Sequence, residues 1–390
     1  MGEAYIATVA RSAGGKRGGR LAGVHPADLA GKVLAALVER SGIDPAAVED
    51  VIMGCACPGG EQGANIARNA VLASGLPESV PGTHVDRQCG SSQQALHFAA
   101  STVMSGTMDV VIAAGVESMT RVPMGLPWTL AAKHGFGTYR SPAIEARYPN
   151  QPFSQFGGAE MMAKKYGFDR DVLDAFALES HRRAASATEH GKFRAEIVPI
   201  EVVTPEGGTL IHEIDEGIRF DATLERIAGV KLLQEGGVTT AANASQICDG
   251  AAALLVVNEH ALKTYGLTPL ARIHQMTVLG HDPVIMLEAP IPATEKALAR
   301  AGMKIGDIDL YEVNEAFAPV PLAWLQALGA DPDRLNVHGG AIALGHPLGG
   351  SGAKLMTTLI NALRDRGGRY GLQTMCEAGG MANVTIVERL

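Results

Sequence analysis

Aromatic residues and long hydrophobic runs are scarce in this chain of 390 residues. Only 5% of the residues are aromatic, and the longest apolar stretches, such as 110–116 and 251–257, are short. They fall far below the ~18 consecutive apolar residues that cross a bilayer, so we expect a soluble protein without a membrane span. At roughly 150 residues per domain, the length predicts two or three core-forming units.

An excess of positive charge is also missing. Charged residues make up 19% of the chain, and the formal net charge is −8. This balance disfavours nucleic-acid binding through bulk charge, although it allows a local basic site for a phosphorylated ligand. Four cations in the first twenty residues would suit an organelle transit peptide, but Gly14-Gly15 and Gly18-Gly19 would interrupt its amphipathic helix.

Cysteines are few and scattered: Cys55, Cys57, Cys89, Cys248 and Cys376. An odd, dispersed count excludes a disulfide framework and predicts reduced thiols in the cytoplasm. Cys55 and Cys57 lack a second cysteine pair or nearby histidines, so no metal site is predicted. Each cysteine is by default a small buried hydrophobic residue.

What the chain does have is an alternation of β-rich and helical stretches, with glycine at the joins. This pattern is typical of an α/β protein. Apolar periodicity predicts helices over 27–40, 92–104 and 351–364, and strands over 50–53, 110–114 and 370–376.

The order of these stretches recurs along the chain. Residues 41–53 resemble residues 301–313, an offset of about 260, so we expect two duplicated α/β halves. The material without a counterpart includes a Pro- and Gly-rich loop stretch over 123–152 and two helices over 158–166 and 170–190. We therefore predict an N-terminal half (1–119), an inserted lid that binds substrate (120–250) and a C-terminal half (251–390), although 251–270 could instead complete the first half.

Two residue types with reactive side chains lie at Gly-rich turns. Cys89 stands where a strand turns into a helix, and the positive end of the helix dipole favours the thiolate there. An inert buried cysteine is the alternative. His346 follows Gly345 in a run of small residues, at the entrance to a helix where its imidazole could serve a thiol. A nucleotide-binding phosphate loop is excluded there, because no Ser or Thr follows Lys354; His338, in the same run, is interpreted as structural.

Two further candidates follow predicted strands. Cys376 ends a strand and precedes glycines, whose backbone N–H groups could face a developing oxyanion. Asn314 also follows a strand, where its amide could hold a water or a carbonyl oxygen, unless it is a simple turn residue.

Together these motifs resemble one family, the thiolases (acetyl-CoA C-acyltransferases). The resemblance covers nearly the whole chain and includes Glu117-Ser118-Met119, Asn314-Glu315-Ala316-Phe317 and Gly345-His346-Pro347. It implies the thiolase fold, in which two duplicated halves form a layered α-β-α-β-α core with an inserted loop domain.

The resemblance also implies roles for the candidates. Cys89 would be the nucleophile that becomes acylated, and His346 would take its proton. His346 and a water held by Asn314 would bind the thioester oxygen. Cys376 would exchange a proton with the departing acetyl-CoA carbanion, and the backbone N–H groups of Cys89 and Ala378 would form a second oxyanion hole.

By the same resemblance, coenzyme A is a substrate and no cofactor or metal is required. A 3-ketoacyl-CoA is cleaved to acetyl-CoA and a shortened acyl-CoA. The family is typically a homodimer or homotetramer. Ala244, Ser245, Ala316 and Phe317 match positions along the pantetheine path, and Arg219 matches a position near the CoA nucleotide.

Two departures from the family pattern matter. Ala378 replaces a glycine of many members, and we predict a negative φ there because an L-residue is strained at positive φ. Residues 155–160, Gln-Phe-Gly-Gly-Ala-Glu, resemble actinobacterial degradative thiolases, including those of steroid catabolism. This favours a degradative enzyme of fatty acid β-oxidation or steroid degradation.

Three alternatives stay open at this stage. The first is an acetoacetyl-CoA thiolase that condenses two acetyl-CoA. The second is a decarboxylating condensing enzyme, which usually carries a second histidine where Cys376 or Asn314 stands. The third is a catalytically silent acyl-CoA or lipid-binding protein, which would need neither Cys89 nor Cys376.

Overall fold

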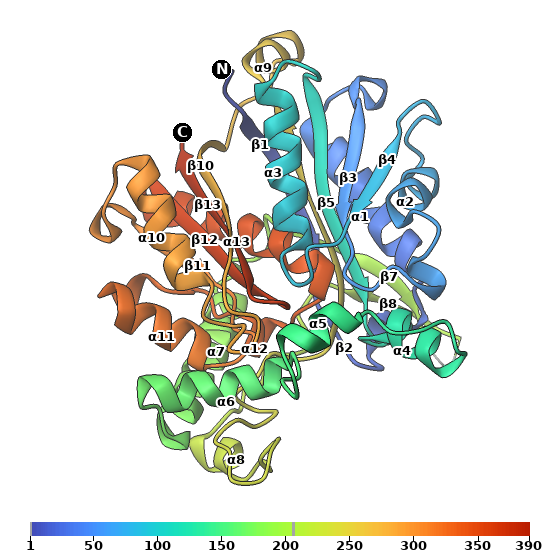
Figure 1. Cartoon of the computed structure of the whole chain (residues 1–390). Coiled ribbons are helices and arrows are strands. Elements are labelled where there is room, and N and C mark those ends of the chain that lie inside the picture. The colour runs from blue at the N-terminus through green and yellow to red at the C-terminus, as the bar shows by residue number, and fades with distance from the viewer. Residues whose placement is uncertain (1, 205–206) are drawn as a thin grey trace.

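A computed structural model describes residues 2–204 and 207–390, and its centre is a long mixed β-sheet that bends into two halves (Figure 1). The N-terminal half contains, in spatial order, β4 (Gly82–Val85), β3 (Asp50–Gly54), β5 (Val110–Ser118), β9 (Cys248–Val257) and β1 (Tyr5–Ser12). The C-terminal half continues with β10 (Ala271–Gly280), β13 (Met381–Arg389), β12 (Tyr370–Glu377) and β11 (Leu310–Val313). Two short strands, β2 (Gly15–Lys16) and β6 (Ile197–Val198), pair with β9 and β1.

The two halves repeat one strand pattern. In the first, β3 pairs parallel with β5, and β9 pairs antiparallel with both β5 and β1. In the second, β11 pairs parallel with β12, and β13 pairs antiparallel with both β12 and β10. The halves join where β1 and β10 share two residue pairs. The predicted α/β duplication is therefore confirmed.

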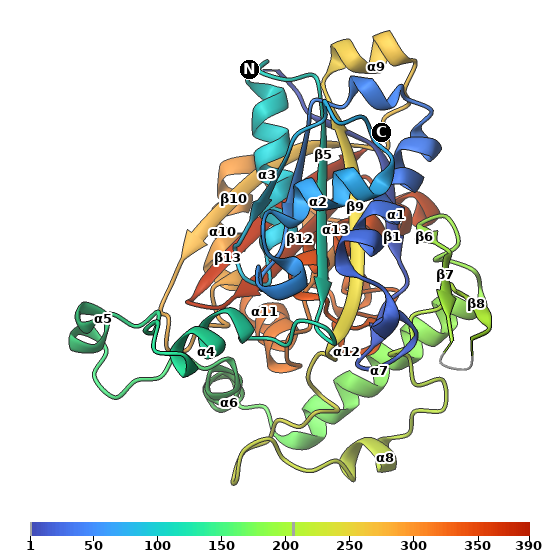
Figure 2. The ribbon, with the colours of Figure 1, turned by 90° about the vertical axis from the view of Figure 1, so that its right-hand side faces the viewer.

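Helices form three layers around these strands (Figures 1 and 2). Buried residues of α1 (Pro26–Ser41) and α2 (Ile66–Ser74) pack on the outer face of the first half. Those of α10 (Pro290–Ala301) and α11 (Pro319–Leu328) pack on the outer face of the second. Between the halves lie α3 (Ser91–Met104) and α13 (Ser351–Arg366), which share a core with strands of both.

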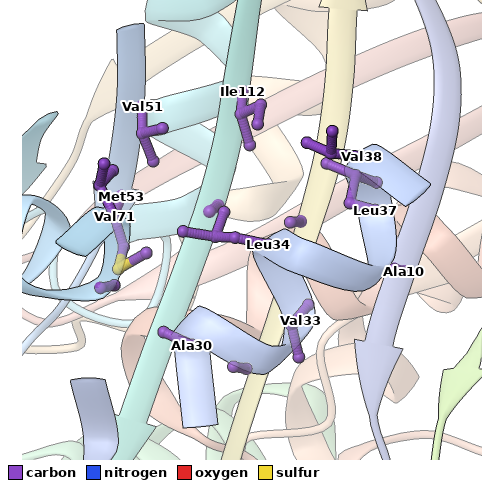
Figure 3. Close-up of a cluster of buried hydrophobic side chains, with 14 of the residues drawn as sticks. Ala10, Ala30, Val33, Leu34, Leu37, Val38, Val51, Met53, Val71 and Ile112 are labelled. Carbon is purple, nitrogen blue, oxygen red and sulfur yellow. The ribbon is translucent and has the colours of Figure 1, made fainter. Parts of the chain in front are cut away.

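The first helix shows how sequence sets these layers. Leu29, Val33, Leu34 and Leu37 recur at helical spacing and are buried in one apolar cluster. Figure 3 shows Val33, Leu34 and Leu37 in this cluster with residues of β3 and β5. The helix starts with Pro26 at a position where the missing N–H costs nothing. It ends at Gly42, whose φ of 70° suits glycine, and so spans the predicted 27–40 with one extra residue at each end.

The inserted segment differs in part from the expectation. The stretch 123–152 was expected to be loop, but it contains two short helices, α4 (Leu126–Lys133) and α5 (Pro142–Arg147). Helices of six to eight residues are too short to show apolar periodicity, and neither buries a side chain. The next helix, α6 (Gln155–Tyr166), begins earlier than residue 158, because the Ser154 side chain caps it by accepting from Gly157 N.

The rest of the insertion contains one long helix, a two-stranded hairpin and one short helix. They are α7 (Arg170–Glu189), the hairpin of β7 (Ile200–Val203) and β8 (Thr209–His212), and α8 (Leu224–Ala228). Helix α9 (Glu259–Tyr265) connects β9 to β10, and α12 (Ala341–Leu344) precedes α13. Since β9 pairs with β1 and β5, residues 248–257 lie within the N-terminal half of the sheet. Among the described residues, no helix is long and apolar enough to cross a membrane.

Candidate functional site

Cys89 lies in the turn between β4 and α3. Gln88 has a φ of 51°, and Gly90 N donates to Arg87 O (3.1 Å), which tightens the turn. The Ser91 hydroxyl fixes it further, because it accepts from Arg87 N (2.9 Å) and donates to Gln88 O (2.6 Å). The result places the buried Cys89 two residues before the first residue of α3, Ser91.

His346 lies just before α13 and is held in one tautomer. Its Nδ1 lies 2.5 Å from the Ser351 hydroxyl, and that hydroxyl donates its single hydrogen to Pro347 O (2.9 Å). Nδ1 must therefore be the protonated nitrogen and the donor to Ser351. Nε2 then carries the lone pair that can accept a proton.

Asn314 and Cys376 stand at the ends of two neighbouring parallel strands. Asn314 N donates to Thr374 O across the β11–β12 ladder (3.1 Å). The Asn314 amide nitrogen lies 3.4 Å from Nε2 of His346, and its buried Oδ1 has no hydrogen-bond partner in the described chain. The Oδ1 atom can thus accept a hydrogen from a water.

The pKa shifts of both thiols and of the imidazole favour their neutral forms. Burial raises the pKa of Cys89 well above its usual 9.0, and the nearby Cys376 and Glu377 raise it further. Burial, followed by Glu377, raises the pKa of Cys376 to about 12. Burial lowers the pKa of His346 to about 3. For Cys89, burial thus acts against the effect expected from the helix dipole.

The Ala378 backbone lies outside the left-handed region, as predicted. The positive φ angles of this turn fall on the next two residues, Gly379 (85°) and Gly380 (74°). A side chain at Gly380 would also meet the backbone of Asp282, at 2.5 Å from its carbonyl oxygen. The two glycines thus adopt the positive φ angles that the turn requires, and Ala378 keeps an unstrained backbone.

Glu377 is a site residue that sequence reasoning missed. Its side chain is fully buried, and neither carboxyl oxygen has a hydrogen-bond partner in the described chain. It lies directly against the Cys89 turn, since a Cβ at Gly90 would stand 1.9 Å from Glu377 Oε1. Burial raises the pKa of Glu377 well above 4.5. No motif marks this contact, which links residues nearly 290 positions apart.

Four of the predicted CoA-binding residues come together beside the site. Ala244 and Phe317 form an isolated β-bridge, and Ser245 N donates to Ala316 O (2.9 Å). The same segment leads to the catalytic candidates, because Gln246 O accepts from His346 N (3.1 Å). Residues 244–246 thus connect the predicted pantetheine path to the imidazole.

Arg219 lines a cavity of about 320 Å³ at the far end of this segment. His181, Arg226 and Gln246 line the same cavity, and Arg226 pairs with Asp221. Arg219 N donates to Nδ1 of His181 (3.2 Å). A cavity with these cations can hold phosphate groups, and only Arg219 of its charged residues was singled out by sequence.

The remaining cysteines have no role in the predicted chemistry. Burial raises the pKa of Cys55, Cys57 and Cys248, as it does for Cys89, and Cys57 packs in the same apolar cluster as Cys89. Within residues 2–204 and 207–390, no group of three or more His, Cys, Asp or Glu side chains could hold a metal ion.

Comparison of the whole chain with known proteins identifies its family. The family model described as "Thiolase, N-terminal domain" matches residues 4–260, and "Thiolase, C-terminal domain" matches residues 267–389. The steroid 3-ketoacyl-CoA thiolase FadA6 of Mycobacterium tuberculosis is 52% identical over 395 residues, covering all of this chain and 95% of the relative.

Two other relatives are less similar. A 3-ketoacyl-CoA thiolase of Psychrobacter cryohalolentis is 43% identical, over 97% of this chain and 96% of its own length. An acetyl-CoA acetyltransferase of Chromobacterium violaceum is 40% identical, over 99% of this chain and all of its own length. Both domain models and these full-length matches agree with the site geometry, and the chain belongs to the thiolase family.

Proposed function

We propose that this acyltransferase is a degradative thiolase that cleaves 3-ketoacyl-CoA with CoA, through an acyl intermediate on Cys89. Two neighbouring pairs carry the proposal: Asn314 beside His346, and Cys376 close enough to Cys89 to raise its pKa. Pure binding of acyl-CoA would need neither thiol, so a catalytically silent protein is disfavoured.

The first half-reaction starts from neutral groups. The Cys89 thiol gives its proton to Nε2 of His346, and the sulfur attacks the 3-keto carbon. Backbone N–H groups of Cys89 and Ala378 would stabilise the negative oxygen that forms. The bond between the α and β carbons then breaks, leaving an acyl thioester on Cys89 and a carbanion of acetyl-CoA.

Cys376 completes this half-reaction by giving its proton to the carbanion. The new N–H of His346 and a water on Asn314 Oδ1 would hold the thioester oxygen, on which the negative charge spreads. A thiol whose pKa is about 12 keeps its proton until so strong a base forms.

The second half-reaction reverses the proton movements. The Cys376 thiolate takes the proton of an incoming CoA thiol, and the CoA sulfur attacks the acyl carbon on Cys89. The Cys89 sulfur leaves and recovers its proton from His346. One 3-ketoacyl-CoA and one CoA thus give acetyl-CoA and a shortened acyl-CoA, as in ping-pong catalysis.

We infer that the acyl group is bulkier than a short linear chain. The support is the higher identity to the steroid thiolase than to the acetyltransferase, 52% against 40%. The segment 155–160 adds support from the chain itself. Its Phe156 packs edge-on against Phe317 on the predicted pantetheine path, with ring centroids 5.7 Å apart.

The test is a series of thiolysis rates with linear, branched and ring-bearing 3-ketoacyl-CoA substrates. We expect kcat/KM to be highest for a ring-bearing or long chain, and mass spectrometry to find the acyl group on Cys89. Cys89→Ser should lose the adduct and the activity. Preference for acetoacetyl-CoA over all other substrates would favour the second candidate, an acetoacetyl-CoA thiolase, which the 40% relative supports.

We further propose a cytoplasmic homodimer or homotetramer. The five reduced cysteines support the compartment. The assembly is supported by the sheet edge at β4, which pairs on one side only with β3 and leaves backbone groups open to another strand. Analytical ultracentrifugation of the full chain distinguishes monomer, dimer and tetramer.

A further inference from the structure

A second cavity, of about 550 Å³, lies on the other side of α7 from the proposed CoA site. The two cavities share no lining residue. His181 faces the CoA cavity, whereas Arg182 and Arg183, the next two residues of α7, line the second cavity. Successive residues of a helix point about 100° apart, so α7 separates the two spaces. The end of α13 and the loop at 333–338 complete the second cavity.

Positive groups dominate the lining of this cavity. Arg182, Arg183, Lys192 and Arg366 line it, whereas Asp333 is the one acidic residue of the lining. Three of the cations already have carboxylate partners: Glu179 pairs with both arginines of α7, and Asp365 pairs with Lys192. Arg366 is exposed and takes part in none of the ion pairs found in the described part of the chain, so its guanidinium can bind an anion that enters the cavity.

His338 gives a second, independent indication of a ligand. Its side chain is 94% buried and lines the cavity, and its ring packs edge-on against Phe193 with centroids 5.9 Å apart. The ring makes no hydrogen bond with a side chain or backbone group of residues 2–204 and 207–390, and its nitrogens are not among the atoms shut off from solvent. The ring therefore reaches the space of the cavity, where its N–H can donate to a ligand.

The electrostatics of His338 agree with this geometry. Burial and the positive charge of Arg366 lower the pKa of His338 to about 4. The neutral ring still offers one N–H donor to an anion. An anion between His338 and Arg366 would also offset the repulsion among the cations of the lining.

We propose that this cavity binds a phosphate-bearing small molecule, with Arg366 and His338 as the groups that hold its phosphate. A volume of about 550 Å³ lies within the ~300–1,000 Å³ of small-molecule sites, so it has room for more than one phosphate group. The inference concerns a site apart from the thiolase chemistry and does not depend on the acyl chain that the enzyme cleaves.

The competing explanation is compensation of helix dipoles. Both α7 and α13 end at this cavity, and cations are favourable near helix C-termini without any ligand. That explanation predicts no specific anion binding. It also predicts no difference between Arg366 and Arg364, which lies on the same last turn of α13 but outside the cavity lining.

The test is isothermal titration calorimetry of the full-length enzyme with inorganic pyrophosphate in low-salt buffer. We expect binding that weakens at least tenfold in Arg366→Ala and in His338→Phe. It should persist in Arg364→Ala, the matched control, and in Arg219→Ala, which alters the CoA cavity. An unchanged melting temperature of the Arg366→Ala protein would show that the variant is folded.

Three results would overturn the proposal: no pyrophosphate binding at millimolar concentration, loss of binding only in Arg219→Ala, or equal weakening in Arg364→Ala and Arg366→Ala. Parallel titrations with ADP and with inorganic phosphate identify the source of the phosphate. Tighter binding of ADP than of pyrophosphate, sensitive to Arg366, supports a nucleotide, and the reverse supports a free diphosphate group.

Discussion

Single polar atoms set the chemistry of this site, and the hydroxyl of Ser351 is the clearest case. It gives its only hydrogen to Pro347 O and so forces Nδ1 of His346 to be the donor. The base nitrogen, Nε2, is thereby directed toward the reacting groups and toward the amide of Asn314. The orientation of the base depends on a residue that makes no contact with substrate in the proposed mechanism.

We therefore expect Ser351→Ala to lower kcat for thiolysis by about 10- to 100-fold, part of the ~10²–10⁴ that general acid–base catalysis contributes. The variant should lower kcat and leave KM nearly unchanged. Without the Ser351 hydroxyl, Nδ1 of His346 is no longer held as the protonated nitrogen, whereas the predicted CoA path is unaltered. Steady-state kinetics with one good substrate measure both constants.

Ser12→Ala is the matched control for that variant. Ser12 is equally buried, and its hydroxyl accepts from Ala251 N rather than from the imidazole. It should lower stability by about 1 kcal/mol and leave kcat intact. An equal fall of kcat in both variants would mean that Ser351 acts only by supporting the fold.

Glu377 controls the nucleophile through charge. As pH rises and Glu377 ionises, its negative charge opposes ionisation of Cys89 beside it. Glu377→Gln removes that charge, so the pKa of Cys89 should fall. At a fixed pH near 9, iodoacetamide should then alkylate Cys89 about tenfold faster in the variant, as read by peptide mass spectrometry.

Glu312→Gln serves as the control for this measurement. Glu312 is another buried carboxyl with an unpartnered oxygen, and its pKa is also raised, but it does not act on Cys89. It should leave the alkylation rate unchanged. If Glu377→Gln also leaves the rate unchanged, the two groups are not coupled.

The sequence predicted the reactive residues but not the residues that tune them. Cys89, His346, Asn314 and Cys376 each sit at a Gly-rich turn or a strand end, which local patterns reveal. Glu377 meets Gly90 only after β12 and α3 have packed together, and such a contact leaves no local pattern. Burial of Cys89, which raises its pKa against the expected dipole effect, likewise leaves no local pattern.

At the scale of elements, the two central helices position the predicted nucleophile and base. The N-terminus of α3 carries Cys89, and the N-terminus of α13 carries Ser351 next to His346. The helices meet at Gly352, where an added Cβ would stand 2.2 Å from the backbone nitrogen of Gln93. Their separation therefore sets the distance between nucleophile and base.

Gly352→Ala should push α13 away from α3. We expect it to lower the free energy of unfolding by about 2–3 kcal/mol, as overpacking does, and to lower kcat by more than tenfold. Urea denaturation and thiolysis rates measure the two effects.

Gly306→Ala is the comparison, since a Cβ at Gly306 would have no atom within 4 Å and the φ of this residue is not positive. It should change stability by less than about 0.5 kcal/mol. If the Gly352→Ala protein were as stable and active as Gly306→Ala, the contact between α3 and α13 would be able to accommodate a methyl group.

Long periodic elements were predictable, and short ones were not. α1, α3, α7 and α13 lie within one or two residues of their expected bounds, because several turns of apolar spacing mark each. α4 and α5 were missed because they are short, exposed and set among prolines and glycines. The division into 1–119, 120–250 and 251–390 stays a prediction.

At the scale of the whole molecule, one buried ionic cluster ties three parts together. Arg11 of β1 binds Asp215 of the insertion through two nitrogens, at 3.0 and 3.1 Å, and Lys354 of α13 binds the same carboxylate at 3.2 Å. Glu196 binds Arg11 at 2.6 Å. The first half, the insertion and the second half thus share one set of charges.

We expect Asp215→Asn to destabilise the protein by about 3–5 kcal/mol at pH 7, because it leaves buried cations unpaired. The cations around Asp215 lower its pKa from 3.8 to about 2, despite burial. Its contribution to stability is therefore complete above pH 3.8 and is lost as pH falls through 2. The difference between variant and wild type should shrink across that window in urea denaturation.

If the difference in unfolding free energy between Asp215→Asn and wild type stayed constant down to pH 2, the lowered pKa of Asp215 would be contradicted. Asp365→Asn provides a control, since its pair with Lys192 is partly exposed and such pairs contribute at most about 1 kcal/mol.

The split of the site between the two duplicated halves has a consequence for ancestry. The nucleophile comes from the first half, and the base and the proton carrier come from the second. A protein made of one such unit could hold both sets only by pairing with a second copy. One chain that contains both units needs no such partner: it carries the thiol before α3 and the imidazole before α13.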